Sequence, residues 1–277
     1  MTNIITLFRP EGIWQSADHM ITLKNGTTLQ PISDATPKQL QISFPPLEDG
    51  PIALMAFAGL AEMSDGTPTL QWIEETLRGE SRDVMTTLEH LKTRLNRDVG
   101  GSPYWTNPLI LTGGIIEGDK QFYFDISNQE TSGPRVTNRF NYRILEVDKP
   151  LGFIAGSGRF HVTPEDLELL EKTVAKKPGR WKQYSGLLAA VNRRIASHDP
   201  TVSPWCYVSF LSKGNGAQGM QFTKPGDPPI PFSIHGILAG IDISQMVRLL
   251  VDQAQSGMLI DQLNLGTASD KSIRPRP

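Results

Sequence analysis

The sequence predicts a single α+β domain in which β-sheets are sandwiched between pairs of helices. Two observations predict this class. Short β-branched or alternating apolar stretches occur in three groups along the chain, and two pairs of segments with apolar residues at helical spacing separate these groups. No repeat with a period of about 20–50 residues and no linker divides the chain, so one layered domain is the economical arrangement.

The strands of the three groups are predicted from alternation or from short, continuous apolar runs. The first two strands, 3–8 and 13–17, are joined by the turn Arg9-Pro10-Glu11-Gly12. The remaining strands are expected over 38–42, 51–58, 109–112, 121–126, 141–147, 152–155, 205–211 and 233–241. A polar loop is expected over 127–138.

The first helix pair follows the strand at 51–58. Thr67 and Pro68 predict an N-cap with proline at the first helical position, and Gly79 ends this helix. The second helix is expected to start near Ser81, with a stripe of apolar residues at steps of four, three and four: Val84, Leu88, Leu91 and Leu95.

The second helix pair begins at Thr163, where Asp166 takes the place of the usual glutamate of a capping box. Pro178-Gly179 separates its two helices, and the second carries the apolar stripe Trp181, Tyr184, Leu188, Val191 and Ile195. A last helix is expected over 244–255, and the segment 267–277 is expected to be disordered.

Composition excludes several classes of protein. The formal net charge of −2 favours neither a nucleic-acid nor a membrane partner. A single cysteine, Cys206, suits a reducing compartment, and no secretory signal or membrane span is expected, so we predict a cytoplasmic protein. The five histidines lack metal-ligand spacing, so we predict no metal and no cofactor. The Gly-x-Gly-x-x-Gly pattern within 213–219 is interpreted as a hairpin loop, since no helix can follow it.

Five motifs fall in a recognisable order. Thr2 and Asp18 are 16 positions apart (18 − 2), and Lys38 precedes a strand. Further along lie Phe57-Ala58-Gly59-Leu60-Ala61, then Gly156-Ser157-Gly158, then His198-Asp199. Over roughly residues 2–211, this order resembles that of the proteasome β-subunit-like N-terminal-nucleophile hydrolases, including bacterial proteasome-related proteins.

The resemblance implies a four-layer αββα sandwich and a threonine-type peptidase or amidohydrolase. It implies six catalytic residues: Thr2, Asp18, Lys38, Gly59, Ser157 and Asp199. Thr2 would be the nucleophile and its α-amine the base, Gly59 the oxyanion donor, and Ser157 and Asp199 would orient the amine. Phe57 and Ala61 would flank the substrate pocket. The substrate would be a peptide or a small amide, and the chain would form a homo-oligomer, with a ring as one form.

The chemistry is coherent on physical grounds. A threonine hydroxyl needs an adjacent base, and an α-amine with a pKa near ~7.7–8.0 is partly neutral at physiological pH. Lys38 would favour the unprotonated amine and stabilise a developing alkoxide, and Asp18 would hold Lys38 charged. Removal of Met1 is required, and we expect it because threonine is small.

Departures from the family pattern support an alternative, a catalytically inactive ring or scaffold subunit. Met63 stands where the family has aspartate, Arg159 replaces a small residue, and Val202 replaces a serine that Ser203 can supply with a one-residue shift.

Ordinary structural roles remain open for the individual motifs. Thr2 can be a plain strand residue, Asp18 a turn cap and Lys38 a solvated edge charge. Gly59 can be a tight turn, the Gly-Ser-Gly segment a strand exit, and Asp199 part of a helix end.

The expected organisation is therefore one domain over 2–266. It comprises a family-like core over about 2–211 and a C-terminal hairpin and helix over 212–266, followed by the segment 267–277.

Overall fold

The computed structural model describes residues 2–25, 28–33, 37–130, 135–166, 168–169, 181–212, 216–243 and 246; of residues 21–36 only the strand backbones are described. The strands are β1 (Asn3–Arg9), β2 (Gly12–Asp18), β3 (Ile21–Asn25), β4 (Thr28–Ser33), β5 (Gln39–Ser43), β6 (Ile52–Gly59), β7 (Leu109–Glu117), β8 (Lys120–Gln129), β9 (Val136–Glu146), β10 (Leu151–Gly156), β11 (Cys206–Ser212), β12 (Gln218–Phe222), β13 (Ile230–Phe232), β14 (His235–Leu238) and β15 (Ile241–Asp242). The α-helices are α1 (Thr69–Leu77), α2 (Val84–Leu95) and α4 (Trp181–Ala196).

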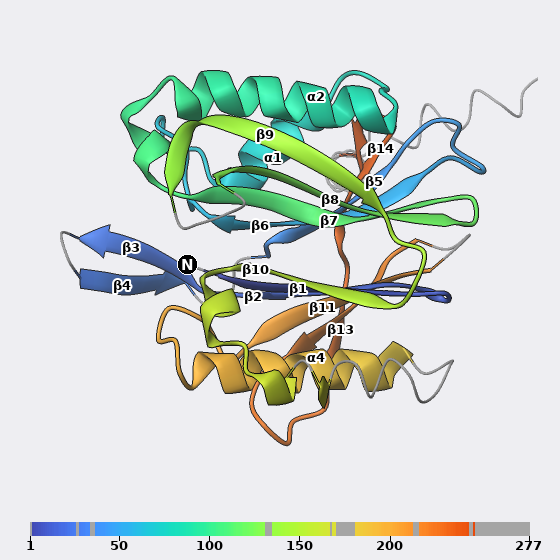
Figure 1. Cartoon of the computed structure of the whole chain (residues 1–277). Coiled ribbons are helices and arrows are strands. Elements are labelled where there is room, and N and C mark those ends of the chain that lie inside the picture. The colour runs from blue at the N-terminus through green and yellow to red at the C-terminus, as the bar shows by residue number, and fades with distance from the viewer. Residues whose placement is uncertain are drawn as a thin grey trace, which may run out of the picture.

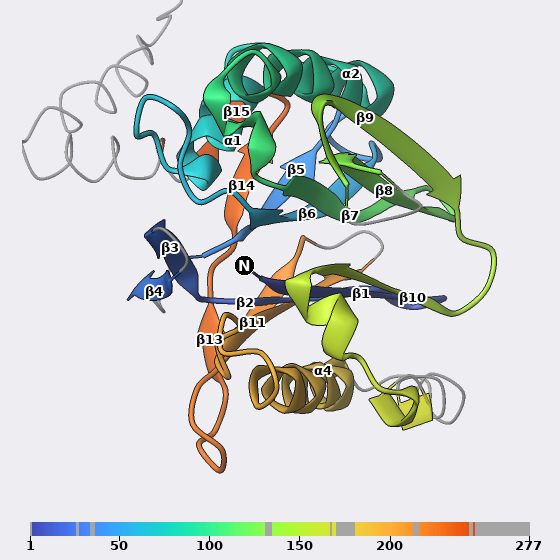
Figure 2. The ribbon, with the colours of Figure 1, turned by 60° about the vertical axis from the view of Figure 1, so that its left-hand side comes forward.

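Two large sheets face each other. The six-stranded sheet has the order β10-β1-β2-β11-β12-β13, and the seven-stranded sheet has the order β15-β14-β5-β6-β7-β8-β9. The pairs are antiparallel except for the parallel pair of β14 with β5. β3 and β4 form a separate two-stranded sheet that projects to one side (Figure 1). Helices α1 and α2 cover the seven-stranded sheet, and α4 covers the six-stranded one (Figures 1 and 2).

Local sequence explains the helix ends. The Asp83 carboxylate accepts a hydrogen bond of 2.8 Å from the Thr86 N–H and caps α2. The predicted cap at Thr67 is wrong: α1 starts one residue later, with Pro68 at the N-cap position and no side-chain cap. The predicted capping box does form, since the Thr163 N–H donates to Asp166 and the Asp166 N–H donates to the Thr163 hydroxyl.

The two inner sheet faces meet through small residues. A Cβ on Gly114 of β7 would lie 2.7 Å from Ile13 Cδ1 and 2.8 Å from Phe8 Cζ, both on the other sheet. Polar side chains also cross the interface, because Gln39 donates to the Gln15 carbonyl at 2.8 Å and accepts from the Ser209 hydroxyl at 2.7 Å. These contacts fix the spacing of the sheets.

The prediction of an α+β, four-layer αββα sandwich is wrong. The part of the chain that the structure describes is mostly β-sheet, because its two large sheets contain 13 strands, six and seven. One helix pair is found, on the seven-stranded sheet, while α4 is the only long helix described on the other side. Of the helix predicted from Thr163, only 164–166 and 168–169 fall within the described residues.

Several strands were not predicted. β3 and β4 lie in a stretch without clear alternation, and β4 and β13 each contain a proline, Pro31 and Pro231, a residue type that is uncommon within sheets. β13 tolerates its proline because it lies at the edge of the sheet. The predicted polar loop 127–138 is shorter, because β8 extends to Gln129 and β9 starts at Val136.

Some expectations concern residues outside the described ranges. Most of the predicted last helix, 244–255, and all of the segment 267–277 lie there. The hairpin expected around 213–219 is confirmed at its strands, since β11 and β12 pair in antiparallel register. The single-domain boundaries stay a prediction.

We expect Gly114→Ala to lower the free energy of unfolding by about 1–3 kcal/mol, because the added methyl group would press on the fully buried side chains of Ile13 and Phe8. Gly186→Ala is the matched control: nothing lies within 4 Å of a Cβ there, and the residue is within α4. It should stabilise the chain by about 0.5–1 kcal/mol. Urea unfolding of both variants tests this, and equal effects would contradict the close sheet contact.

Candidate active site

Thr2 lies immediately before β1 and is buried, with 3% of its surface exposed. The Gly156 backbone closes over it, since a Cβ on Gly156 would lie 1.9 Å from the Thr2 carbonyl oxygen and 3.4 Å from the Ala58 Cβ. Gly156 has a positive φ of 87°. Both the conformation and the close approach therefore require glycine at this position.

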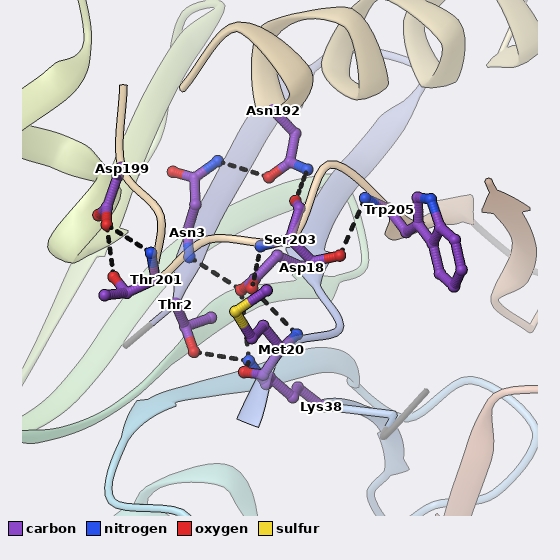
Figure 3. A network of polar contacts seen from close by, with 10 residues as sticks. All are labelled: Thr2, Asn3, Asp18, Met20, Lys38, Asn192, Asp199, Thr201, Ser203 and Trp205. Carbon is purple, nitrogen blue, oxygen red and sulfur yellow. Dashed lines mark hydrogen bonds and ion pairs between the residues drawn. The ribbon is translucent and has the colours of Figure 1, made fainter. Parts of the chain in front are cut away.

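Lys38 precedes β5 in the opposite sheet, and its side chain reaches Thr2 at the start of β1 (Figure 3). Its Nζ donates to the Thr2 hydroxyl at 2.7 Å, to Asp18 Oδ1 at 3.3 Å and to the Met20 carbonyl. An ammonium group has three N–H donors and a neutral amine has two. Three acceptors around one nitrogen therefore suit the charged form.

Asp18 ends β2 and is fully buried. Besides Lys38, its carboxylate accepts three backbone N–H groups, from Asn3 at 3.0 Å, Met20 at 3.1 Å and Ser203 at 3.1 Å. Hydrogen bonds from N–H groups and a cation stabilise the ionised form of a carboxylate. Asp18 therefore joins the two ends of the β1–β2 hairpin, the segment before β5 and the segment before β11.

Two effects act on the pKa of Lys38 in opposite directions. Burial lowers the pKa of the Lys38 ammonium below its ordinary value of 10.5, and the charge and hydrogen bond of Asp18 raise it. Burial is the larger cause. The site thus holds a lysine that loses its proton more readily than a solvated one, next to a threonine hydroxyl.

The Gly-Ser-Gly segment also lies at the start of β1. A Cβ on Gly158 would lie 2.6 Å from Asn3 Oδ1, and Asn3 pairs with Gly156 in the sheet register. The Ser157 hydroxyl is buried and has no hydrogen-bond partner among the described residues. Burying a hydroxyl group without a hydrogen-bond partner costs free energy. The Ser157 hydroxyl can therefore still form a hydrogen bond with a further group.

Gly59, the predicted oxyanion donor, ends β6 directly after Ala58. Its φ is 107°, and a Cβ there would lie 1.9 Å from the Pro108 carbonyl oxygen. The close approach of Pro108 is by itself a sufficient reason for glycine. An oxyanion role for Gly59 stays a prediction.

Asp199 is turned toward other partners. It accepts hydrogen bonds from the Thr201 N–H at 2.9 Å and the Thr201 hydroxyl at 2.5 Å, and His161 Nε2 lies 3.9 Å from its other oxygen. Figure 3 shows Asp199 and Thr201 to one side of Thr2. Asp199 thus lies near the site, but the hydrogen bonds of its carboxylate are made to Thr201, two residues along the same loop.

A pocket role for the two residues predicted to flank the substrate, Phe57 and Ala61, stays a prediction. Phe57 is 3% exposed and belongs to the core between the seven-stranded sheet and its helices. Ala61 lies in the loop after β6, where its carbonyl accepts the Thr69 N–H. Met63 and Val202, two of the departures from the family pattern, are buried apolar residues of the two helix-side cores, and Arg159 lies over the Phe160 ring.

Sequence reasoning missed a polar bridge from α4 to the site. Asn192 accepts from Asn3 Nδ2 at 3.0 Å and donates to the Ser203 carbonyl at 2.8 Å (Figure 3). Both asparagines are fully buried. The available signal was Asn192 itself, a polar residue next to Val191 in the apolar stripe of α4, because buried amides require partners.

Other chemistry is limited in the described part of the chain. No group of three or more His, Cys, Asp or Glu side chains gathers there as in a metal site. Cys206 is buried, and burial raises the pKa of its thiol to about 12, so it is an inert core residue, as predicted. No described helix is both long and apolar enough to cross a membrane.

Comparisons with known proteins give a fold likeness. No protein-family model matches the chain, and no curated protein matches it. Solved structures do: Anbu (ancestral beta-subunit) from Yersinia bercovieri has a TM-score of 0.51 at 14% identity, covering 99% of this chain and 100% of that one. Anbu from Hyphomicrobium sp. strain MC1 has a TM-score of 0.52 at 12% identity, with the same coverage. A Gly-1 mutant of the Hyphomicrobium protein has a TM-score of 0.53 at 13% identity, covering 80% of this chain and 88% of that one.

These findings correct the recognition made from sequence. Assignment of the chain to the proteasome β-subunit-like N-terminal-nucleophile hydrolases is wrong as stated, since the described residues form two large, mostly antiparallel sheets and not the αββα sandwich that the assignment implied. The comparisons support a narrower statement: the fold is similar to that of Anbu proteins, at an identity too low to carry an activity.

We expect the difference in the free energy of unfolding between wild type and Lys38→Met to shift in favour of wild type as the pH rises in the alkaline range. Between the lowered pKa of Lys38 and 10.5, the unfolded chain binds more protons than the folded one, so increasing pH favours the folded state. Below that window the difference should be constant. Urea unfolding of both proteins from about pH 7 to about pH 10 measures it. Curves that stay parallel throughout would show that the pKa of Lys38 is not lowered.

We expect Asp18→Ala to destabilise the chain by about 3–5 kcal/mol, because it leaves the buried Lys38 ammonium uncompensated. Adding Lys38→Met should recover part of this loss, since no charge then remains. The exposed pair Lys120–Glu146 provides the control: Glu146→Ala should cost less than about 1 kcal/mol. No recovery in the double variant would contradict the pairing of Asp18 with Lys38.

Proposed function

We propose that the chain is an amide hydrolase whose nucleophile is the Thr2 hydroxyl, acting once Thr2 carries a free α-amine, with peptides as the substrate class. The observation that supports this most directly is the 2.7 Å hydrogen bond from a buried lysine to the Thr2 hydroxyl. A buried lysine–carboxylate pair in contact with a hydroxyl group is more typical of a functional site than of a threonine with a purely structural role.

In the proposed reaction, the Thr2 oxygen attacks the carbonyl carbon of the amide and its proton passes to the Thr2 α-amine. The Lys38 ammonium stabilises the negative charge that develops on the attacking oxygen, and Asp18 fixes the ammonium in position. A nearby backbone N–H would hold the oxyanion, and Gly59 is the candidate donor.

The tetrahedral intermediate then collapses. The C–N bond breaks, the protonated α-amine gives its proton to the leaving amine, and the acyl group remains on Thr2 as an ester. Water, activated by the same amine, attacks the ester and restores the hydroxyl. The buried, unpartnered Ser157 hydroxyl is suited to orienting the amine through a hydrogen bond, since it has no other described partner.

A second candidate function is that of an inactive structural subunit. Asp199, predicted to orient the amine, accepts hydrogen bonds from Thr201, and Phe57, predicted to flank the pocket, belongs to a buried apolar cluster. In that case the Thr2–Lys38–Asp18 contacts serve stability alone. A homo-oligomer and a cytoplasmic location remain predictions under either function.

We expect Thr2→Ala to lose hydrolysis of a panel of peptide–fluorophore amides by roughly a thousandfold or more, because the nucleophile is gone. Thr2→Ser keeps the hydroxyl and should retain activity. The matched control is Thr93→Ala, at an exposed position of α2.

Intact mass spectrometry of each protein shows whether Thr2 is the first residue. Equal turnover by wild type and Thr2→Ala would reject the hydrolase. An inactive wild type that retains Met1 would favour the structural subunit.

A further inference from the structure

A groove of about 520 Å³ lies far from Thr2, between the segment 44–51, the end of β7 and the start of α2. Its apolar lining includes Phe44, Val84, Ile115, Phe122 and Ile144. Three prolines, 45, 46 and 51, extend this surface. Met85 stands 47% exposed beside it, and Leu47 in the same segment is 57% exposed.

Four carboxylates border the groove: Asp49, Asp83, Glu117 and Glu146. The Thr86 N–H lowers the pKa of Asp83, so that carboxylate is charged at neutral pH. Glu146 is partly compensated by Lys120 at 3.2 Å, whereas no ion pair among the described residues involves Asp49 or Glu117. The groove thus combines an apolar floor with a net negative border.

The groove is separate from the candidate active site. Ile52 and Ile116 pair at the groove end of β6 and β7, and Gly59 and Leu109 pair at the other end. Seven residues of strand separate Ile52 from Gly59, which corresponds to about 23 Å. The β7–β8 turn and the start of β1 lie at opposite ends of the molecule (Figure 1). An occupant of the groove would not touch Thr2.

The chain itself contains a segment of complementary chemistry. Residues 267–277 read TASDKSIRPRP, with three cationic side chains and one carboxylate, a formal charge of +2. An Arg-Pro-Arg-Pro sequence favours the polyproline II conformation, and such segments bind grooves lined with aromatic residues. Arginines that meet carboxylates at the border provide charge complementarity.

The segment can reach the groove. The Ala239 N–H donates to the Ser43 carbonyl at 2.9 Å, so the chain just before 243 lies beside the residue that precedes Phe44. From 247 to 266 there are 20 residues, which span about 30 Å even as a helix. This length is sufficient to bring 267–277 to the groove.

We propose that residues 267–277 bind in the groove of the same chain, with the prolines and Ile273 on the apolar floor and Arg274 and Arg276 against Asp49 and Glu117. The proposal is independent of the activity at Thr2.

The test uses the full chain with Arg274→Glu and Arg276→Glu, which vacates the groove without shortening the protein. A fluorescein-labelled peptide of residues 267–277 is titrated by anisotropy. It should bind this variant, and bind wild type roughly tenfold more weakly, because the wild-type segment competes. Adding Asp49→Lys and Glu117→Lys should weaken peptide binding by roughly three- to tenfold. The control pair Glu62→Lys and Asp227→Lys, at exposed sites outside the groove lining, should not.

Three results would overturn the proposal. The first is that the peptide does not bind the variant with Arg274→Glu and Arg276→Glu. The second is that it binds wild type as tightly as this variant. The third is that both pairs of lysine substitutions weaken peptide binding equally. Equal binding to wild type would point to a segment supplied by a second copy or another partner.

Discussion

The structure depends on one buried cation. Lys38 Nζ lies between the two sheets, and its three acceptors come from the start of β1, the end of β2 and the residue that precedes β3. Removing an ammonium group from water is costly, and only a full set of well-placed acceptors offsets that cost. The positions of the neighbouring segments are therefore constrained by the charge they surround, and Asp18 transmits the constraint to the segment before β11 through Ser203.

The hydrogen bonds around Asp18 continue into helix α4. Asn192 ties α4 to both Asn3 and Ser203, so the helix that covers the six-stranded sheet also fixes the hydrogen-bond donors of Asp18. Buried polar groups that pair with one another in a network favour one geometry, although Asn3 Oδ1 has no hydrogen-bond partner among the described residues. The Ser157 hydroxyl, buried and without a described partner, marks the side where the network is open.

Sequence patterns recovered what is local. The strands with β-branched alternation, the apolar stripes of α2 and α4 and the Thr163 capping box were all predictable, because each depends on neighbours within a few residues. The grouping of Thr2, Asp18 and Lys38 was implied by the family resemblance and not by a local pattern, and the structure does bring the three side chains together. The β3–β4 hairpin, the bridge through Asn192 and the core position of Phe57 were not predictable, since they depend on contacts between distant segments and on strand register. The prediction of a four-layer αββα sandwich was wrong for the same reason, because the additional edge strands have weak local sequence signals.

The four-way grip on Asp18 has a consequence for the timing of biosynthesis. Its donors come from positions 3, 20, 38 and 203, so the last of them is translated when about three quarters of the 277 residues have been made. A nascent chain on the ribosome lacks that contact, and with it the complete electrostatic setting of Thr2. The hydrogen bonds around Asp18, and with them the position of Lys38 beside Thr2, can therefore be completed only after residue 203 has been made, when roughly a quarter of these 277 residues is still to be translated.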